Sequence, residues 1–195
     1  MLLLAKLSLI HGVSYKSELI KSATQTNPTY LHIIIPHRTN WPLTETCVKA
    51  FIRFTTRPYT ITVVNNFDHN SVPTLITTHP AISIIENKRT WLGHILVALN
   101  NHLQGSLENA LALDLALAAR THFEWAFMAH SDSAPLAYSW EESFFDALNG
   151  GLIIGNYRDK NRIHAAHASG TLFHQQTFLQ KKISTQLFFF PFGNY

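Results

Sequence analysis

The sequence contains one cysteine, Cys47, among its 195 residues. A single cysteine can form neither an intrachain disulfide nor a cysteine-based structural zinc site, so we expect a reducing, cytoplasmic compartment. Charged residues are also scarce, at 14%, whereas hydrophobic residues reach 46%, which excludes a disordered chain and a coiled coil. The 15 Lys and Arg barely outnumber the 12 Asp and Glu, which argues against a dedicated nucleic-acid binder.

Long hydrophobic runs are missing too. No apolar stretch approaches the roughly 18 to 20 residues of a membrane-spanning helix, so we expect a soluble protein with at most a peripheral membrane association. The apolar opening at residues 2–10 is interrupted by Lys6, and neither a preceding cationic segment nor a cleavage pattern marks it as a signal peptide. The length suits one globular domain with a sizeable core.

Short apolar runs rich in β-forming residues recur along the chain, and helix-like segments separate several of them. These runs are Leu31 to Ile35, Tyr59 to Val64, Ala81 to Ile85, Phe123 to Met128 and Leu152 to Ile154. Such alternation predicts an α/β domain with a mostly parallel sheet.

Two helices have recognisable ends. Asn40 is a candidate N-cap before Pro42, and apolar residues then recur on one face. A second, nearly all-apolar helix is expected from an N-cap at Ser106 to Ala119, with Glu108 in its first turn. Residues 1–30 are weakly patterned, and we interpret them as an N-terminal extension with a loosely attached helix, followed by one domain over residues 31–195.

Polar side chains follow the first two predicted strands of this domain, where ligands bind in open α/β sheets. The candidate binding residues are Pro36, His37 and Arg38 after the first strand, and Asn65, Asn66 and Asp68 after the second. The alternative is an ordinary strand-to-loop turn, because Asn and Asp favour turns.

The strand ending at Met128 is followed by His130, Ser131 and Asp132. A carboxylate at a strand end can hold a divalent cation that keeps other coordination positions for water and phosphate. In an extended strand His130 lies on the same side as Asp132, and imidazole suits manganese or zinc better than magnesium. The alternative is that Ser131, Asp132 and Ser133 cap the next segment.

A second possible metal site contains only histidines. His164 and His167 would share one face of a helix, and His174 follows, but no carboxylate lies nearby in sequence. We therefore weigh a histidine-based zinc protein only as a competing hypothesis. The sequence has no nucleophile elbow, Walker loop or Gly-rich dinucleotide motif, so hydrolase, NTPase and dehydrogenase functions lack support.

Taken in order, the segments 31–38, 61–68 and 127–132 resemble the nucleotide-binding strands of family 2 glycosyltransferases of the GT-A fold. Ala112 to Asp114 is similar to the helix that leads to the family's metal motif, and Ala168 to Phe173 to its Gly-containing acceptor-side segment. The resemblance covers roughly residues 31 to 178 and implies a Rossmann-type three-layer α/β/α sandwich.

Three positions depart from the family pattern. Asn65 stands where the family has a base-recognising aspartate, although its amide oxygen could still accept from a uracil N–H. Phe67 replaces a glycine, and His130 replaces the first acid of the Asp-X-Asp motif. Asp132 matches the acid that ligates the metal directly.

The resemblance implies a hexosyltransferase that uses a nucleotide sugar, expected to be a UDP sugar, and Mn²⁺ or Mg²⁺. Pro36, His37, Arg38, Asn65, Asn66, Asp68 and Ser131 would hold the donor, and Asp132 and His130 the metal. Transfer would invert the anomeric centre, onto a carbohydrate or lipid-linked acceptor, in polysaccharide biosynthesis. No nucleic-acid partner is expected.

The catalytic base stays unassigned. The family supplies it from an acidic motif downstream of the Gly-containing segment, whereas Asp159 is the last acid of this chain. We therefore expect a domain incomplete at its C-terminal acceptor side, and keep as the alternative a non-catalytic GT-A-like module that binds a nucleotide sugar.

Overall fold

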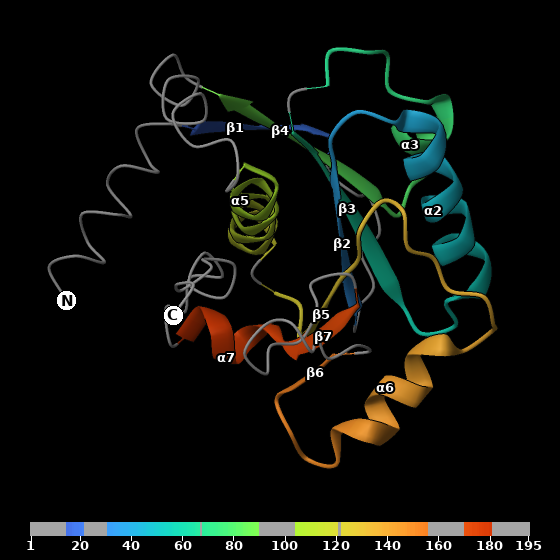
Figure 1. Ribbon diagram of the computed structural model, residues 1–195. Helices are drawn as coiled ribbons and strands as arrows, with labels where there is room; N and C mark the ends of the chain where they lie inside the picture. The colour runs from blue at the N-terminus through green and yellow to red at the C-terminus, as the bar shows by residue number, and fades with distance from the viewer. Residues whose placement is uncertain are drawn as a thin grey trace, which may run out of the picture.

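The structure is a computed structural model that describes residues 15–21, 31–66, 68–89, 104–120, 122–155 and 170–180. Its described strands form one sheet in the order β1-β4-β3-β2-β5-β7-β6 (Figure 1). The strands are β1 (Tyr15–Lys21), β2 (Leu31–His37), β3 (Tyr59–Asn66), β4 (Ile82–Arg89), β5 (Trp125–Met128), β6 (Ile153–Gly155) and β7 (Thr171–His174). The helices are α2 (Trp41–Phe54), α3 (Thr74–Thr78), α5 (Gln104–Ala119), α6 (Trp140–Leu148) and α7 (Gln175–Gln180).

The centre of the sheet is parallel. β2 pairs in parallel with β3 on one side and with β5 on the other, and β3 pairs in parallel with β4. β1, β7 and β6 extend this centre by antiparallel pairing. β2 is buried along its whole length, as expected for a strand covered on both faces, and the predicted strands at 31–35, 59–64, 81–85, 123–128 and 152–154 are confirmed with small shifts at their ends.

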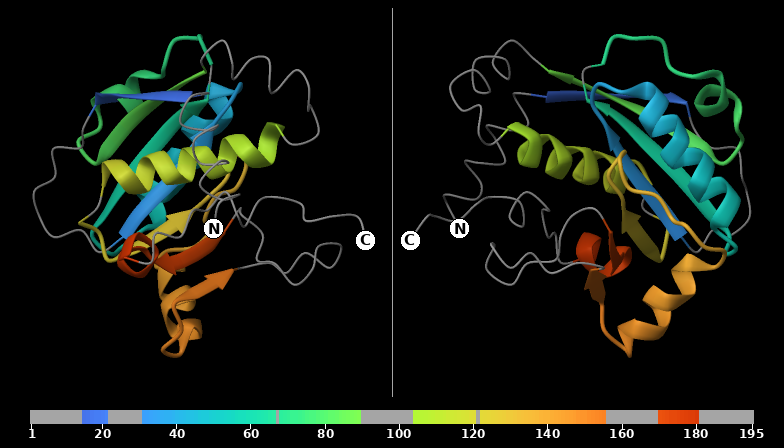
Figure 2. Two further views of the ribbon diagram at one scale, coloured as in Figure 1. Left: turned by 90° about the vertical axis from the view of Figure 1, so that its left-hand side faces the viewer. Right: turned by 45° about the vertical axis from the view of Figure 1, so that its right-hand side comes forward.

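Helices cover both faces of the sheet (Figures 1 and 2). One apolar cluster joins α2 and α6 to one face through residues such as Phe51, Phe127 and Trp140. The other cluster joins α5 and α7 to the opposite face through residues such as Leu113, Met128 and Phe178. The predicted three-layer α/β/α arrangement is therefore confirmed.

The two predicted helices differ in how well their starts were placed. Asn40 caps α2 as expected, because its side-chain oxygen accepts the backbone N–H of Leu43 at 3.1 Å. The second helix begins at Gln104, so the predicted N-cap at Ser106 is wrong: Ser106 lies inside α5. Glu108 consequently lies one turn into the helix rather than at its start.

The prediction of a loosely attached helix within residues 1–30 is wrong at residues 15–21, because these residues form β1 at the edge of the sheet. Phe67, Asp159, His164 and His167 lie outside the described residues. Among the helices in the described ranges, none has the length and apolarity needed to cross a membrane.

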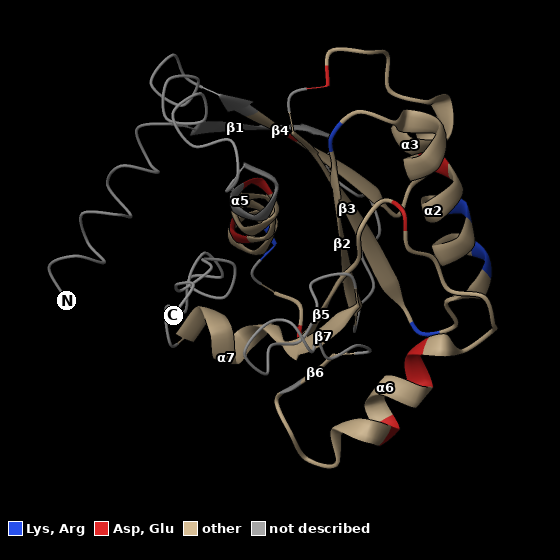
Figure 3. Ribbon diagram, viewed as in Figure 1, with Lys and Arg blue, Asp and Glu red and all other residues tan. Residues whose placement is uncertain are grey.

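α6 is fastened to the loop between α2 and β3. Glu141 is buried, and its Oε1 accepts backbone N–H groups from Thr56 at 2.6 Å and Arg57 at 2.8 Å. Arg57 also donates to both carboxylate oxygens of Glu142, at 2.7 and 2.6 Å. Figure 3 shows the acidic first turn of α6 beside this basic loop, so charge as well as apolar packing fixes α6.

A polar network crosses the α5–α7 face of the sheet. His32 lies fully buried, with Nε2 2.8 Å from the Thr62 hydroxyl and Nδ1 3.1 Å from the Gln175 carbonyl oxygen. Burial, with a smaller contribution from the positive Arg120, lowers the pKa of His32 to about 3 although the hydrogen bond to Gln175 opposes the shift. The ring is therefore neutral, with Nδ1–H donating to Gln175, and it ties α7 to the sheet.

We predict that His32 makes folding acid-sensitive. The unfolded chain binds a proton at His32 near pH 6.5, but the folded chain binds it only near pH 3, so stability falls as the pH decreases through this window. Between pH 7 and 5, wild type should lose about 2 kcal/mol more unfolding free energy than His32→Gln, at ~1.4 kcal/mol per pKa unit. Urea unfolding at both pH values measures this, and equal losses in the two proteins would contradict it.

Candidate functional site

The candidate site lies along the carboxyl edge of the three central strands. β3, β2 and β5 are neighbours and run in parallel, so their carboxyl ends meet at one edge. Asn65 and Asn66 end β3, His37 ends β2, and His130 follows β5 closely. The sheet therefore brings all three predicted strand ends together.

His37 is fully buried between charged and aromatic neighbours. Its Nε2 lies 2.8 Å from Asp68 Oδ2, its Nδ1 lies 2.7 Å from the Thr44 hydroxyl, and its ring stacks on Trp41 at 3.6 Å. Burial lowers the pKa of His37, while the Asp68 carboxylate opposes this shift. A neutral ring donates its Nε2–H to Asp68 and accepts the Thr44 hydroxyl proton at Nδ1.

Asp68 carries the negative charge of this pair. Desolvation alone would raise the pKa of Asp68, but hydrogen bonds from Asn70 and His37 outweigh it, so the net pKa is lowered. Oδ1 accepts from the backbone and the side chain of Asn70 at 2.9 and 2.6 Å, and Oδ2 accepts from His37. Both carboxylate oxygens are thus already engaged within the protein.

Asn65 links this pair to β4. Its Nδ2 donates to the Asp68 carbonyl at 2.8 Å and to the Glu86 carboxylate at 2.9 and 3.1 Å. Its Oδ1 accepts the Asp68 backbone N–H at 3.1 Å, and the residue is only 1% exposed. Beside it, Asn87 donates to the Asn66 side-chain oxygen at 2.8 Å.

These contacts form what we call the tip network, whose members are Thr44, His37, Asp68, Asn65 and Glu86. It joins α2, β2, β3 and β4 through buried hydrogen bonds. Of the predicted donor ligands, Pro36, His37, Asn65, Asn66 and Asp68 are buried here. They hold the strand ends in place, and direct contact between them and a donor stays a prediction.

The segment after β5 is a β-turn. The Ser133 N–H donates to the His130 carbonyl at 3.0 Å, and the Ser133 hydroxyl donates to the same carbonyl at 2.8 Å. The Cys47 thiol of α2 donates to the Ser133 carbonyl at 2.9 Å. Burial, with a smaller contribution from Asp132, raises the pKa of Cys47 to about 12, so the thiol keeps the proton it donates.

We call residues 130–133 the tip turn. β5 ends at Met128, so the expectation that His130 and Asp132 share one side of an extended strand is wrong. Ser133 closes this turn, and the segment does not cap α6, which begins after Ser139. Asp132 is exposed at a central turn position, and Ser131 and His130 are partly exposed.

The exposed end of β2 carries Arg38. Its Nε lies 3.5 Å from Oε2 of Glu108 in α5, and 51% of its side chain is exposed. β5, which precedes the tip turn, is the strand next to β2, and Ala129 donates its backbone N–H to the Ile34 carbonyl at 3.0 Å. A cationic and an anionic side chain therefore lie at adjacent strand ends, Arg38 on β2 and Asp132 beyond β5.

The donor set at the tip turn fits a cation that is shared with a ligand. Within the described ranges no group of three or more His, Cys, Asp and Glu side chains could hold a metal by itself. Asp132 offers one exposed carboxylate, and Mn²⁺ or Mg²⁺ bound there would complete its coordination with diphosphate oxygens and water. His130 is less available, because its Nε2 lies 3.4 Å from the Asn109 amide nitrogen.

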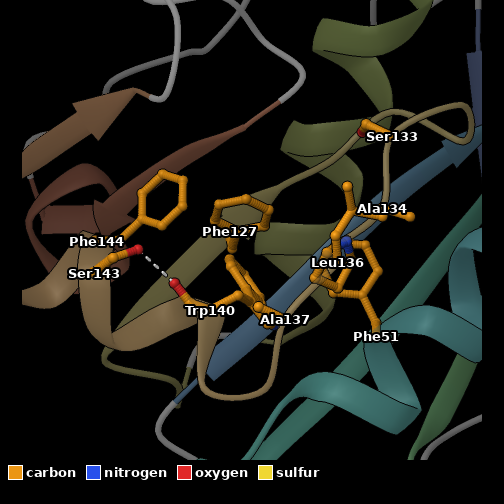
Figure 4. Close-up of a pocket in the computed structure, with 10 residues that line it drawn as sticks. Phe51, Phe127, Ser133, Ala134, Leu136, Ala137, Trp140, Ser143 and Phe144 are labelled. Atoms are coloured by element: carbon orange, nitrogen blue, oxygen red, sulfur yellow. Dashed lines mark hydrogen bonds between the residues drawn. The ribbon is translucent and has the colours of Figure 1, made fainter.

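A separate pocket of about 300 Å³ lies between α2, β5 and α6. Figure 4 shows its aromatic walls, Phe51, Phe127, Trp140 and Phe144, with Leu136 and Ala137 beside them. The serine hydroxyls at its edge are engaged: Ser143 donates to the Trp140 carbonyl at 2.7 Å, and Ser133 closes the tip turn. The residues that line this pocket include no Lys or Arg that could bind a phosphate.

The histidine-only zinc hypothesis stays largely untested, because only His174 lies within the described residues. Its Nδ1 lies 2.9 Å from the Thr177 hydroxyl, and its Nε2 lies 4.0 Å from Glu124.

The sequence did not identify several residues of this edge as members of the candidate site, among them Thr44, Cys47, Glu86, Glu108 and Asn109. Glu108 and Asn109 did carry a signal, since they are consecutive polar residues in a mostly apolar helix. Thr44 and Cys47 lie among the apolar positions of α2 and have no local pattern that separates them from core residues.

Comparison of the sequence with protein-family models and with curated proteins gives no match. Solved structures do match. The mannosyltransferase PcManGT from Pyrobaculum calidifontis, in complex with GDP-Man and Mn²⁺, aligns with a TM-score of 0.59 and 15% identity, covering 93% of this chain and 54% of that one. S. aureus TarS 1-349 aligns with a TM-score of 0.51 and 10% identity, covering 83% and 54%.

These similarities concern the fold. The predicted GT-A-like, Rossmann-type sandwich is confirmed, whereas membership of family 2 stays a prediction. The chain spans about half the length of each of these two structures.

We predict that the hydrogen bond from the Thr44 hydroxyl to Nδ1 of His37 contributes to the free energy of unfolding. Thr44→Val removes the hydroxyl that donates to Nδ1, and the unpartnered ring nitrogen should lower the unfolding free energy by about 1 to 3 kcal/mol. Thr46→Val, an exposed position on the same helix, should change it by less than about 0.5 kcal/mol. Urea unfolding followed by circular dichroism compares the two, and equal losses would argue against a special role for Thr44.

Proposed function

We propose that this chain is the nucleotide-sugar-binding domain of a glycosyltransferase. The observation that carries the proposal is the pair of accessible charges at neighbouring strand ends, Arg38 beside β2 and Asp132 beyond β5, on a GT-A-like sheet. A nucleoside diphosphate is both anionic and metal-binding, and this edge offers a cation for the first property and a carboxylate for the second.

The proposed donor is a UDP sugar, as the family 2 resemblance implies. Arg38 would contact diphosphate oxygens through its exposed guanidinium, and the Ser131 hydroxyl would add a hydrogen bond. Glu86 is partly exposed and held by Asn65, so it is a candidate acceptor for N–H groups of the base. The mannosyltransferase of similar fold is in complex with GDP-Man, which supports testing guanosine donors beside uridine donors.

Asp132 would hold the proposed divalent cation together with the diphosphate, and His130, the second predicted ligand, would join it by exchanging its Nε2 contact with Asn109 for the cation. A bound cation would supply charge stabilisation for the departing nucleoside diphosphate. Residues of the chain would bind and orient the nucleotide. Arg38 would contact the diphosphate, and the Cys47 thiol would keep the tip turn in position through its hydrogen bond to the Ser133 carbonyl.

The proposed reaction is a single displacement with inversion. The acceptor hydroxyl forms a bond to the anomeric carbon while the bond to the nucleoside diphosphate breaks, and the hydroxyl proton passes to a general base. The proposed acceptor is a carbohydrate or a lipid-linked sugar. The base is unassigned.

A second candidate function is a GT-A-like module that binds a nucleotide sugar without turning it over. The observation that favours it is that residues 160–195 contain neither Asp nor Glu. The two candidates share the donor site and differ only in chemistry.

We predict that Asp132→Ala abolishes Mn²⁺-dependent binding of UDP, with a loss of affinity of about 100-fold or more, equivalent to ~2.7 kcal/mol. Asp146→Ala removes an exposed acid from α6 and should leave binding unchanged, as should His167→Ala, which tests the histidine-only site. Isothermal titration with UDP in the presence and absence of Mn²⁺ gives the affinities. Equal affinity in wild type and Asp132→Ala would remove Asp132 from the site.

A turnover assay separates the two candidate functions. With Mn²⁺ and a panel of UDP and GDP sugars, a glycosyltransferase should release or transfer the sugar. A binding module should show Mn²⁺-dependent stabilisation by UDP in a thermal shift assay, with no sugar released. A chain that shows neither turnover nor stabilisation would contradict both.

A further inference from the structure

Two consecutive residues of α5 contact two different strand ends. α5 crosses the sheet and packs against β2, β3 and β4 (Figure 2). Glu108 reaches Arg38 at the end of β2, with Oε2 3.5 Å from Nε. Asn109 reaches His130 beyond β5, with Nδ2 3.4 Å from Nε2. The resemblance to family 2 glycosyltransferases concerns residues 112–114 of this helix and assigns no role to Glu108 or Asn109.

Glu108 is a buried carboxylate of α5. It is only 2% exposed, and Ala110, Leu111 and Ala112 follow it as buried residues. A buried carboxylate is costly unless cations or hydrogen-bond donors compensate it, and Arg38 is a cation within ion-pair distance of Glu108. The pairing uses Nε and leaves the terminal guanidinium nitrogens of a half-exposed side chain able to contact an anion.

Asn109 acts on the ring of His130. An amide nitrogen only donates, so Nε2 of His130 is the acceptor and a neutral ring carries its proton on Nδ1. At 3.4 Å this contact is longer than an ideal hydrogen bond, as is the 3.5 Å ion pair between Glu108 and Arg38, so each residue restricts its partner through a long polar contact.

We propose that Glu108 and Asn109 are positioning residues of the donor site, through which α5 ties the end of β2 to the tip turn. Glu108 holds Arg38 where it contacts the diphosphate, and Asn109 holds the His130 ring in one tautomer. The diphosphate role of Arg38 rests on the proposed function, whereas the positioning itself is a property of the free protein.

The positioning is tested without a nucleotide by side-chain ¹⁵N NMR. In wild type the Arg38 Nε–H should be nearly as ordered as rigid backbone, with an order parameter near ~0.85, and a value below ~0.6 would overturn the proposal. Glu108→Gln should shift the Arg38 Nε signal and leave the His130 ring signals unchanged. Asn109→Leu should change the balance of His130 tautomers and leave Arg38 unchanged.

Glu45→Gln is the matched control, because it neutralises an acid of α2 that pairs with Lys49 at 2.9 Å. It should move neither set of signals. Loss of Arg38 order in Glu45→Gln, or no change in Glu108→Gln, would contradict specific positioning. If Glu108→Gln fails to fold, the order parameter of the Arg38 Nε–H in the wild type still tests the positioning of Arg38.

The link to binding is tested with UDP and Mn²⁺ in a double-mutant cycle. Glu108→Gln should weaken binding by about 5- to 10-fold in wild type but by less than about 2-fold in Arg38→Ala, because Glu108 acts through Arg38. Equal losses in both backgrounds would show that Glu108 acts by another route and would overturn the proposal.

The two proposals fail in different ways. A wild-type chain with an ordered Arg38 that binds neither UDP nor GDP with Mn²⁺ would refute the proposed function, and with it the diphosphate role of Arg38. A wild-type chain that binds UDP while Glu108→Gln binds it equally well would refute the positioning and leave the proposed function intact.

Discussion

The hydrogen bond between neutral His37 and ionised Asp68 is the contact on which the carboxyl edge of the sheet depends. Both ring nitrogens and both carboxylate oxygens are engaged, so the pair connects α2, the end of β2 and the loop after β3 in one fixed arrangement. Asn65 extends the same arrangement to Glu86 on β4. Arg38 directly follows His37, and its place on the exposed edge is therefore set by buried chemistry one residue earlier.

The central strands and α2 were predictable because their signals are local. β2 and β3 are continuous apolar runs, and Asn40 is followed by a helical pattern. β1 was missed because an edge strand needs only backbone pairing with β4, which weak patterning does not reveal. The start of α5 was misplaced because a serine with good capping propensity, Ser106, lies within a helix that begins earlier.

The location of the candidate site was predictable from the sequence. Which of its residues form internal hydrogen bonds, and which stay accessible to a ligand, was not. Polar residues after parallel strands identify the edge, yet they do not tell which side chains bond to one another and which stay accessible. Asn65 and Arg38 looked equivalent in sequence, but the first is 1% exposed and the second half-exposed. The partners that decide this, Glu86 for Asn65 and Glu108 for Arg38, lie far away along the chain, so no local pattern connects them.

The buried thiol of Cys47 has a practical consequence for spectroscopy. With a pKa of about 12, only roughly one molecule in ten thousand carries a thiolate at pH 8, and the thiolate is the form that attacks alkylating reagents. Cys47 is also the sole cysteine of the sequence. A cysteine introduced at an exposed position such as Leu136, 90% exposed, would therefore take a fluorophore or spin label selectively, with the native residue left in place.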